Sequence, residues 1–180
     1  LHLPDGSRIA TSYSAQFYDL TRLAAYPEPV LEVEVGRFCV DPVARHPDIL
    51  RAAWALMTRY VDGNAIGLMF GCTSFQGTRV ADYHQSFAYL RQNHLAPEVW
   101  KPLVKAGDVH RFGEMPDCGQ VDLKQAIKGL PPLLRTYLAM GGWVSDHAVI
   151  DRDLDTIHVF TGVEVKSVPP ARARMLRALS

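Results

Sequence analysis

The stretch Leu31–Val40, LEVEVGRFCV, places the strongest constraint on how this chain folds. Before Gly36, apolar residues alternate with Glu32 and Glu34, and this period of two predicts a β-strand with one buried face. The alternation changes phase at Gly36, and one extra residue there would restore it, which predicts a β-bulge. The bulge would bring Glu34 and Arg37 onto one face, beside backbone groups that the sheet leaves free. A substrate could use this arrangement, and a structural ion pair on a solvated face explains it equally well.

The segments after this strand predict a helix and then a second, buried strand. In Pro47–Asp62 apolar residues recur at helical spacing, and Gly63 with Asn64 ends the pattern. Ile66–Cys72 is a continuous apolar run, too short for a typical helix, as expected of a strand buried on both faces. Strand, helix and strand form a βαβ unit, so the two strands should be parallel. The polar segment Thr73–Thr78 is expected to be a loop at the carboxyl end of the second strand, where ligands bind in open α/β sheets.

The remaining segments predict a mixture of helices and strands. Ser14–Tyr26 has weak helical spacing, and Val121–Met140 is expected to form two helices that a proline pair separates. Trp143–Ile150 and Thr156–Val165 are predicted to be two strands joined by a hairpin turn. The length of 180 residues, 48% of them apolar, indicates one domain over residues 1–180.

Composition and cysteine spacing argue against several classes of function. The 19 basic and 19 acidic residues balance, so nucleic acid is disfavoured as a partner. The three cysteines form no CxxC pair, which indicates a reducing cytoplasm rather than a disulfide framework. No apolar run is long enough to span a membrane, and no histidine or cysteine spacing is typical of a metal site. Glycine-rich phosphate loops and the GxSxG motif are also absent.

Two groups of residues could carry chemistry. Glu34 is a plausible general base for an amine nucleophile if burial raises its pKa, and Arg37 could bind a carboxylate. Asp146 could hold an ammonium group, and the adjacent His147 could move protons near neutral pH. A strand with alternating polar residues explains this second pair as well as a site does. Cys72 is a weaker candidate for a catalytic thiol, because hydroxyl neighbours and a distant histidine occur in many chains.

Several longer motifs resemble one protein family. EVGRFCVDP at Glu34–Pro42, HPDILRAAWALMTRYVD at His46–Asp62 and LMFGCTSFQGT at Leu68–Thr78 are similar to the ornithine–acyl-carrier-protein N-acyltransferases. PPLLRTYLAMGGWVSDHAVIDRDLDTIHVFTGVEV at Pro131–Val165 and SYSAQFYDL at Ser12–Leu20 are also similar to that family. The resemblance covers nearly the whole chain, and its specificity lies in the combination of motifs.

The resemblance implies an α/β (α+β) fold: a GNAT-like acyltransferase domain with a mixed sheet, a bulged central strand and a pantetheine-binding βαβ unit. It extends to acyl-homoserine-lactone synthases, whose Glu-x-x-Arg-Phe signature matches Glu34, Arg37 and Phe38. In GNAT folds the donor's pantetheine arm lies between two splayed parallel strands, here Leu31–Val40 and Ile66–Cys72. Family members have more chain before the matching segment, so the first strand and helices of the domain are expected to be missing.

The activity that the resemblance implies is transfer of a 3-hydroxyacyl group from acyl-carrier protein to the α-amino group of L-ornithine, which forms lyso-ornithine lipid. The (Q/R)xxGxG/A loop of acetyl-CoA-binding GNAT enzymes is replaced by the glycine-free segment VARHPDIL. This departure favours a carrier-protein donor, whose single phosphate would face a helix N-terminus. No cofactor is expected beyond the 4'-phosphopantetheine arm of that donor, and no metal. The expected location is the cytoplasm, with a peripheral contact at the inner face of the cytoplasmic membrane.

The resemblance also implies roles for individual residues. Glu34 would take a proton from the amine or orient it, Arg37 would organise Glu34 or bind the amino-acid carboxylate, and backbone amides at Gly36 would hold the acyl oxyanion. Substrate contacts are expected from Phe38, Cys72, Ser74, Phe75, Asp146 and His147. The donor phosphopantetheine would contact Arg45, Asp48, Ile49 and Leu50. A basic docking patch for the acidic carrier protein would comprise Arg45, Arg51, Lys101, Lys105 and Arg111.

Three alternatives stay open. An acyl-homoserine-lactone synthase would require S-adenosylmethionine and release a lactone. A GNAT enzyme that uses acyl-CoA on another amine would need no carrier protein. A non-catalytic module would bind acyl-carrier protein or an acyl chain without turnover, and an exposed Glu34 with no channel between the two strands would favour it. The sequence leaves open the acceptor amino acid, the acyl chain length and which of Glu32 and Glu34 is the base.

Overall fold

A five-stranded mixed sheet forms the centre of the computed structural model, which describes residues 9–25, 31–36, 47–115 and 119–178. The strand order is β2-β3-β7-β6-β5, with β2 and β3 parallel and the other neighbours antiparallel. A second sheet is the antiparallel pair β1-β4. The strands are β1 Tyr18–Asp19, β2 Leu31–Glu34, β3 Ile66–Gln76, β4 Leu103–Val104, β5 Val109–His110, β6 Trp143–Asp151 and β7 Thr156–Glu164.

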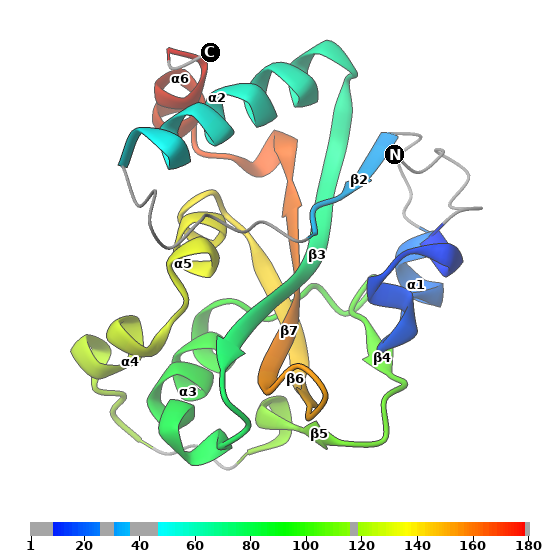
Figure 1. Cartoon of the computed structure of the whole chain (residues 1–180), viewed down its shortest axis with the longest axis vertical. Helices are drawn as coiled ribbons and strands as arrows, with labels where there is room; N and C mark the ends of the chain where they lie inside the picture. The colour runs from blue at the N-terminus through cyan, green and yellow to red at the C-terminus, as the bar shows by residue number, and fades with distance from the viewer. Residues whose placement is uncertain (1–8, 26–30, 37–46, 116–118, 179–180) are drawn as a thin grey trace.

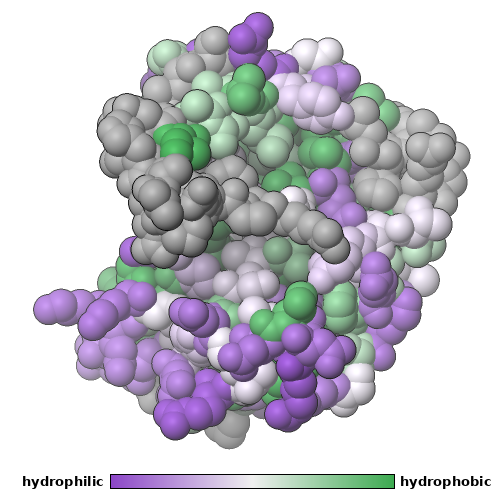
Figure 2. All heavy atoms as spheres, viewed as in Figure 1, coloured by the Kyte–Doolittle hydropathy of each residue, from purple (hydrophilic) through white to green (hydrophobic). Residues whose placement is uncertain are grey.

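Within the described residues, six α-helices surround the sheet (Figure 1). They are α1 Thr21–Ala24, α2 Pro47–Gly63, α3 His84–Asn93, α4 Leu123–Gly129, α5 Pro132–Ala139 and α6 Pro170–Arg177. Five short 3₁₀ helices complete the chain: η1 Ile9–Thr11, η2 Ser14–Gln16, η3 Val80–Tyr83, η4 Phe112–Glu114 and η5 Val165–Ser167. Hydrophilic side chains gather on the lower part of the face in Figure 2, over α3 and α4. This mixed architecture confirms the expected fold class and is consistent with a GNAT-like acyltransferase fold.

The predicted βαβ unit is present. α2 connects the parallel strands β2 and β3 and covers nearly the same residues as the predicted helix. Its inward side chains pack on the sheet, and burying one such side chain fully contributes about 1.5–3 kcal/mol. Tertiary burial therefore holds α2 against the sheet, as its amphipathic pattern predicts. The cluster contains Trp54, Met57 and Val61 of α2 with Ile66, Met69, Tyr137, Met140 and Val163.

Strand β3 is longer than the sequence predicted. It pairs with β7 without interruption from Leu68, opposite Glu164, to Gln76, opposite Thr156. The expectation of a loop from Thr73 onward was therefore wrong for its first four residues. The polar residues continue the strand because β7 supplies backbone partners along the whole length. The predicted β6–β7 hairpin is confirmed, and β6 carries a register shift between Val144 and Ala148.

Strand β2 differs in detail from the prediction. The strand ends at Glu34 in the structure. Residues Arg37 to Val40 of the predicted strand lie outside the described part of the chain. The recorded register shift lies between Leu31 and Glu32 rather than at Gly36. The expectation of one buried face was also wrong, because the Glu32 side chain is only 3% exposed. Neighbouring parts of the protein pack on both faces of β2. The alternation in its sequence therefore did not identify a solvent-exposed face.

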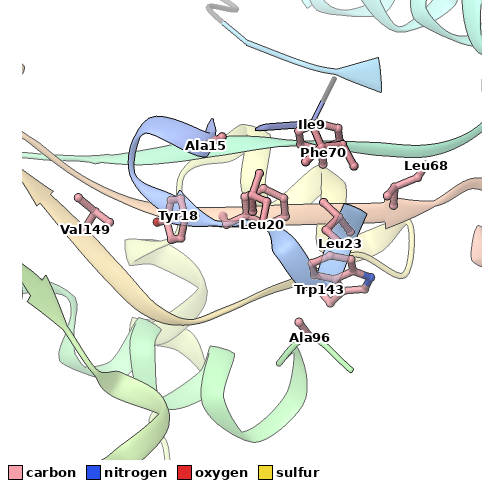
Figure 3. Close-up of a cluster of buried hydrophobic side chains, with 11 residues drawn as sticks. Ile9, Ala15, Tyr18, Leu20, Leu23, Leu68, Phe70, Ala96, Trp143 and Val149 are labelled. Carbon is pink, nitrogen blue, oxygen red and sulfur yellow. The ribbon is translucent and has the colours of Figure 1, made fainter. Parts of the chain in front are cut away.

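The N-terminal segment 9–25 covers the sheet face that bears Leu68 and Phe70. Figure 3 shows side chains of this segment packed against β3, β6 and β7. The segment consists of η1, η2, β1 and α1, so the prediction of a single helix over Ser14–Tyr26 was wrong. Pairing of β1 with β4 interrupts the helical pattern. The buried contacts involve Ile9, Tyr18, Leu20 and Leu23 from the segment and Leu68, Phe70, Trp143, Val149 and Phe160 from the sheet.

Candidate active site

The described pairing of the two parallel strands ends at a defined point. The last paired residues are Glu34 and Phe70, and the amide of Val35 donates a hydrogen bond of 2.7 Å to the carbonyl of Phe70. Beyond this bond, β3 continues to Gln76. A Cβ atom on Gly71 would lie 2.2 Å from the carbonyl oxygen of Val35. Only glycine permits this close approach of the two backbones, so the Phe70-Gly71 step shapes the opening between the strands.

A pocket of about 290 Å³ lies at this opening. The β2 end, β3 and β7 form its floor and edge, and the start of α5 forms another wall. Three residues that the sequence singled out, Gly36, Cys72 and Ser74, line it. The pocket lies where a channel between the two strands was predicted, and whether the strands splay beyond Gly36 depends on residues outside the described part of the chain. The other lining residues are Val35, Met69, Phe70, Gly71, Thr73, Pro131, Pro132, Leu133, Tyr137, Thr161 and Val163.

Phe75 does not belong to this pocket lining. Its side chain is 2% exposed and packs in the core against Tyr83 and Phe87. The sequence placed Phe75 in a loop, whereas it lies within β3 and points into a hydrophobic cluster. The expected substrate contact of Phe75 is therefore replaced by a structural role.

The half-buried carboxylate of Glu34 is fixed by the N-terminal segment. It accepts hydrogen bonds from the backbone amides of Tyr13 (2.9 Å) and Ser14 (2.7 Å). The Ser14 hydroxyl in turn accepts a hydrogen bond of 3.4 Å from the thiol of Cys72, which lines the pocket. These contacts connect Glu34 to the pocket edge and hold it in one orientation. Tyr13 and Ser14 were not predicted as part of the site, because no sequence pattern indicates that they contact Glu34, about 20 residues further along the chain.

Cys72 is poorly suited to act as a nucleophile. Burial raises the pKa of its thiol to about 12, outweighing the hydrogen bond to Ser14. The thiolate is the reactive form of cysteine, so at neutral pH this side chain is a protonated wall of the pocket. A covalent intermediate on Cys72 is therefore disfavoured.

Asp146 and His147 lie in the irregular part of β6, outside the pocket lining. Asp146 Oδ1 is 2.7 Å from His147 Nδ1, and Asp146 Oδ2 is 3.0 Å from Lys101 Nζ. Burial alone would raise the pKa of Asp146, but the hydrogen bonds from His147 and Lys101 lower it to about 2. The carboxylate thus already holds an ammonium group of its own chain. A substrate ammonium at Asp146 stays a prediction, and it would have to displace or join Lys101.

A buried polar cluster next to His147 escaped sequence reasoning. The Tyr18 hydroxyl donates to the carbonyl of His158 at 2.8 Å, and the Tyr18 and His147 rings lie 5.2 Å apart. Burial lowers the pKa of His158 to about 4, so its imidazole is neutral at pH 7. Within the part of the chain that the structure describes, the buried Nε2 atoms of His147 and His158 have no hydrogen-bond partner. Only the tertiary contact of β1 with β6 and β7 brings these residues together.

Several predicted site residues cannot be placed. Arg37, Phe38 and Arg45 lie outside the described residues, as do the side chains of Asp48, Leu50 and Arg51. Ile49, in the first turn of α2, is 37% exposed and does not line the pocket. The described members of the expected basic patch are each engaged in contacts. Lys101 pairs with Glu98 and Asp146, the Lys105 ammonium donates to the carbonyl of Ala15, and Arg111 pairs with Glu114.

Glu32, two residues before Glu34, has a raised carboxyl pKa, in contrast to Asp146. Its Oε2 atom is buried and has no hydrogen-bond partner among the described residues, and burial raises the pKa of the carboxyl group to about 7. An unfolded chain loses this proton near pH 4.5. Between about pH 4.5 and 7 the folded protein holds a proton that the unfolded chain has released. The free energy of unfolding therefore falls as the pH rises through this interval.

Glu32→Gln is expected to remove this pH dependence. At pH 8 the variant should exceed the wild type in free energy of unfolding by up to about 3 kcal/mol, because the ionised form is no longer buried. At pH 4.5 the two proteins should be nearly equal. Urea denaturation at both pH values measures the difference. The depressed pKa of His158 weakens both proteins equally below pH 6.5, so parallel curves for the two proteins would contradict the assignment to Glu32.

The described residues also answer two questions about other kinds of site. No group of three or more histidine, cysteine, aspartate or glutamate side chains among them is arranged to hold a metal ion. None of their helices combines the length and hydropathy needed to cross a membrane.

Comparison with known proteins gives one consistent result. The chain is 33% identical to the L-ornithine N(alpha)-acyltransferase of Rhodobacter capsulatus, over 90% of this chain and 61% of that protein. It is 30% identical to the protein of that name from Brucella abortus, over 87% of this chain and 55% of that protein. These matches support the ornithine acyltransferase family. A third acyltransferase of the same name, from Agrobacterium fabrum, is 26% identical over 87% of this chain and 53% of that protein.

The match to these acyltransferases is partial in length. The chain spans between about half and three fifths of the curated relatives. No protein-family model matches it, and no solved structure matches it significantly. The family relationship therefore rests on these relatives, and the fold description on the architecture given above.

Proposed function

We propose that this chain is the catalytic part of an N-acyltransferase that moves a 3-hydroxyacyl group from acyl-carrier protein to the α-amino group of L-ornithine. The observation that carries the proposal is the pocket at the end of the β2–β3 pairing, whose lining begins at Val35, directly after Glu34 with its carboxylate fixed by Tyr13 and Ser14. The similarity to proteins named L-ornithine N(alpha)-acyltransferase supports ornithine as the acceptor.

The proposed reaction needs no metal. The donor's pantetheine arm would enter between the strands, and the backbone of Gly36 would hold the thioester carbonyl oxygen. The α-amine nitrogen attacks the carbonyl carbon, and a tetrahedral oxyanion forms that the amide would stabilise. Glu34 takes the proton released from nitrogen. The carbon–sulfur bond then breaks, the electron pair leaves on sulfur, and the proton held by Glu34 is available to the departing thiolate.

Partners and location belong to the same proposal. An acidic carrier protein would dock through basic side chains, for which the candidates are Arg45, Arg51, Lys101, Lys105 and Arg111. The product is a lipid, so a peripheral contact with the inner face of the cytoplasmic membrane is expected. α6 supports such a contact because it bears Arg172 and Arg174 together with Met175, whose side chain is 47% exposed.

A mass-spectrometric assay tests the function directly. The protein would be incubated with 3-hydroxyacyl-carrier protein and a panel of amino acids, and N-acyl-ornithine is the expected product. Activity with acyl-CoA in the absence of carrier protein would identify acyl-CoA, rather than acyl-carrier protein, as the acyl donor. A lactone formed only with S-adenosylmethionine would indicate a homoserine-lactone synthase. Binding of the donor without any product would indicate a non-catalytic module, a reading that the half-buried Glu34 and the pocket disfavour.

A further inference from the structure

Two threonine hydroxyls meet in the floor of the pocket. Thr73 lies on β3 and Thr161 on the adjacent β7, and their Oγ1 atoms are 3.0 Å apart. Thr73 is 4% exposed and Thr161 is 3% exposed, yet both line the cavity of about 290 Å³. Neither belongs to the residues that carry the proposed chemistry. The pair is a polar patch in a wall that otherwise includes Met69, Leu133, Tyr137 and Val163.

The hydrogen-bond count of this pair leaves one donor over. Each hydroxyl has one hydrogen and two acceptor lone pairs. The contact between the two oxygens uses one hydrogen, and the described part of the chain shows no acceptor for the other. Because both hydroxyls line the cavity, this second hydrogen is available to a group that enters it. A ligand hydroxyl in the pocket would accept it in place of solvent.

We propose that the Thr73–Thr161 pair recognises the hydroxyl group on the acyl chain of the donor and so selects a 3-hydroxyacyl over an unsubstituted acyl group. This inference rests on the proposed function, because it concerns the donor bound in the same pocket. A hydroxyl two carbons from the thioester carbonyl lies close to the reacting centre, where both strands line the cavity. An acyl chain without the hydroxyl leaves the pair unsatisfied, and such a mismatch is what lets a polar site reject an apolar analogue.

The test compares two donors of equal chain length in wild type and in the double variant Thr73→Val/Thr161→Val. Valine keeps the side-chain shape, and replacing both partners together avoids leaving one hydroxyl unpaired. The wild type should have a kcat/KM at least about tenfold higher for the 3-hydroxyacyl thioester than for the unsubstituted one. The double variant should lose this preference through a fall in the rate for the hydroxylated donor alone.

Thr156→Val is the matched control, because Thr156 lies on the same strand β7 but outside the pocket. It should keep the wild-type preference. Binding of the two acyl groups as non-transferable pantetheine amides, measured by calorimetry, separates this inference from the proposed function. A tenfold preference in binding without any transfer would support the threonine pair and contradict the proposed function. Equal binding of the two amides by the wild type, or an equal loss for both donors in the double variant, would overturn the inference.

Discussion

Replacing Glu34 by glutamine is expected to lower the turnover of ornithine acylation at least about 100-fold, because general-base catalysis contributes about 10²–10⁴-fold. Glutamine has nearly the same size but does not take up the proton of the attacking amine. The KM for ornithine should change much less than kcat. Steady-state kinetics with saturating 3-hydroxyacyl-carrier protein measure both parameters.

The structural role of Glu34 requires a stability measurement alongside the kinetics. The carboxylate accepts the amides of Tyr13 and Ser14, and the glutamine side chain offers only one acceptor oxygen to them. A loss of about 1–3 kcal/mol in the free energy of unfolding is therefore expected. Assays are run where the variant is fully folded, as judged by circular dichroism. Glu32→Gln is the matched comparison, and full activity of Glu34→Gln with loss in Glu32→Gln would transfer the base to Glu32.

Gly71→Ala is expected to disturb the pocket more than any other single methyl group. Its Cβ would lie 2.2 Å from the carbonyl oxygen of Val35, a backbone atom that moves only if β2 moves. Such overpacking costs about 1–3 kcal/mol, or roughly 2–12 °C in Tm for a chain of this size. Because the shift displaces Val35 and Gly36 at the proposed site of transfer, kcat/KM should fall at least about 100-fold. Thermal denaturation and the acylation assay measure the two effects.

Gly107→Ala is the control for Gly71→Ala. A Cβ at Gly107 has no neighbour within 4 Å, and its backbone is not in the left-handed region. This variant should retain wild-type activity and stability to within about 0.5 kcal/mol. A Gly71→Ala protein with wild-type Tm and activity would show that β2 adjusts freely, and the close crossing would then have no role in shaping the pocket.

Much of the fold could be predicted from local patterns. The helical spacing in 47–62 and the apolar run in 66–72 are strong signals, and the βαβ unit that follows from them is confirmed. The β6–β7 hairpin and the proline-separated helices α4 and α5 were predicted for similar reasons. The N-terminal segment was not, because its short elements owe their form to β4 and to the sheet face that they cover.

Part of the pocket lining was predictable from the sequence, but its contacts were not. The sequence singled out Gly36, Cys72 and Ser74, and all three line the pocket. Sequence could not show that Thr161 would complete the pocket, because it belongs to a strand more than 80 residues away. The sequence also predicted a loop at Phe75. The polar residues around it are typical of a turn, although here they continue a fully paired strand.

Sequence alone determined the elements whose side chains repeat with a fixed period, since period and burial are linked within a single helix or strand. Its motifs also pointed to the proteins that the chain resembles. Only the tertiary structure decided the surroundings of Glu32 and Glu34, and with them the pKa of Glu32 and the hydrogen bonds of Glu34. Glu32 and Glu34 are neighbours on one short strand, yet burial raises the pKa of Glu32, while Glu34 is held by the amides of Tyr13 and Ser14. The reason is physical: a pKa and a hydrogen bond depend on what surrounds a group in space, and those surroundings come from distant parts of the chain.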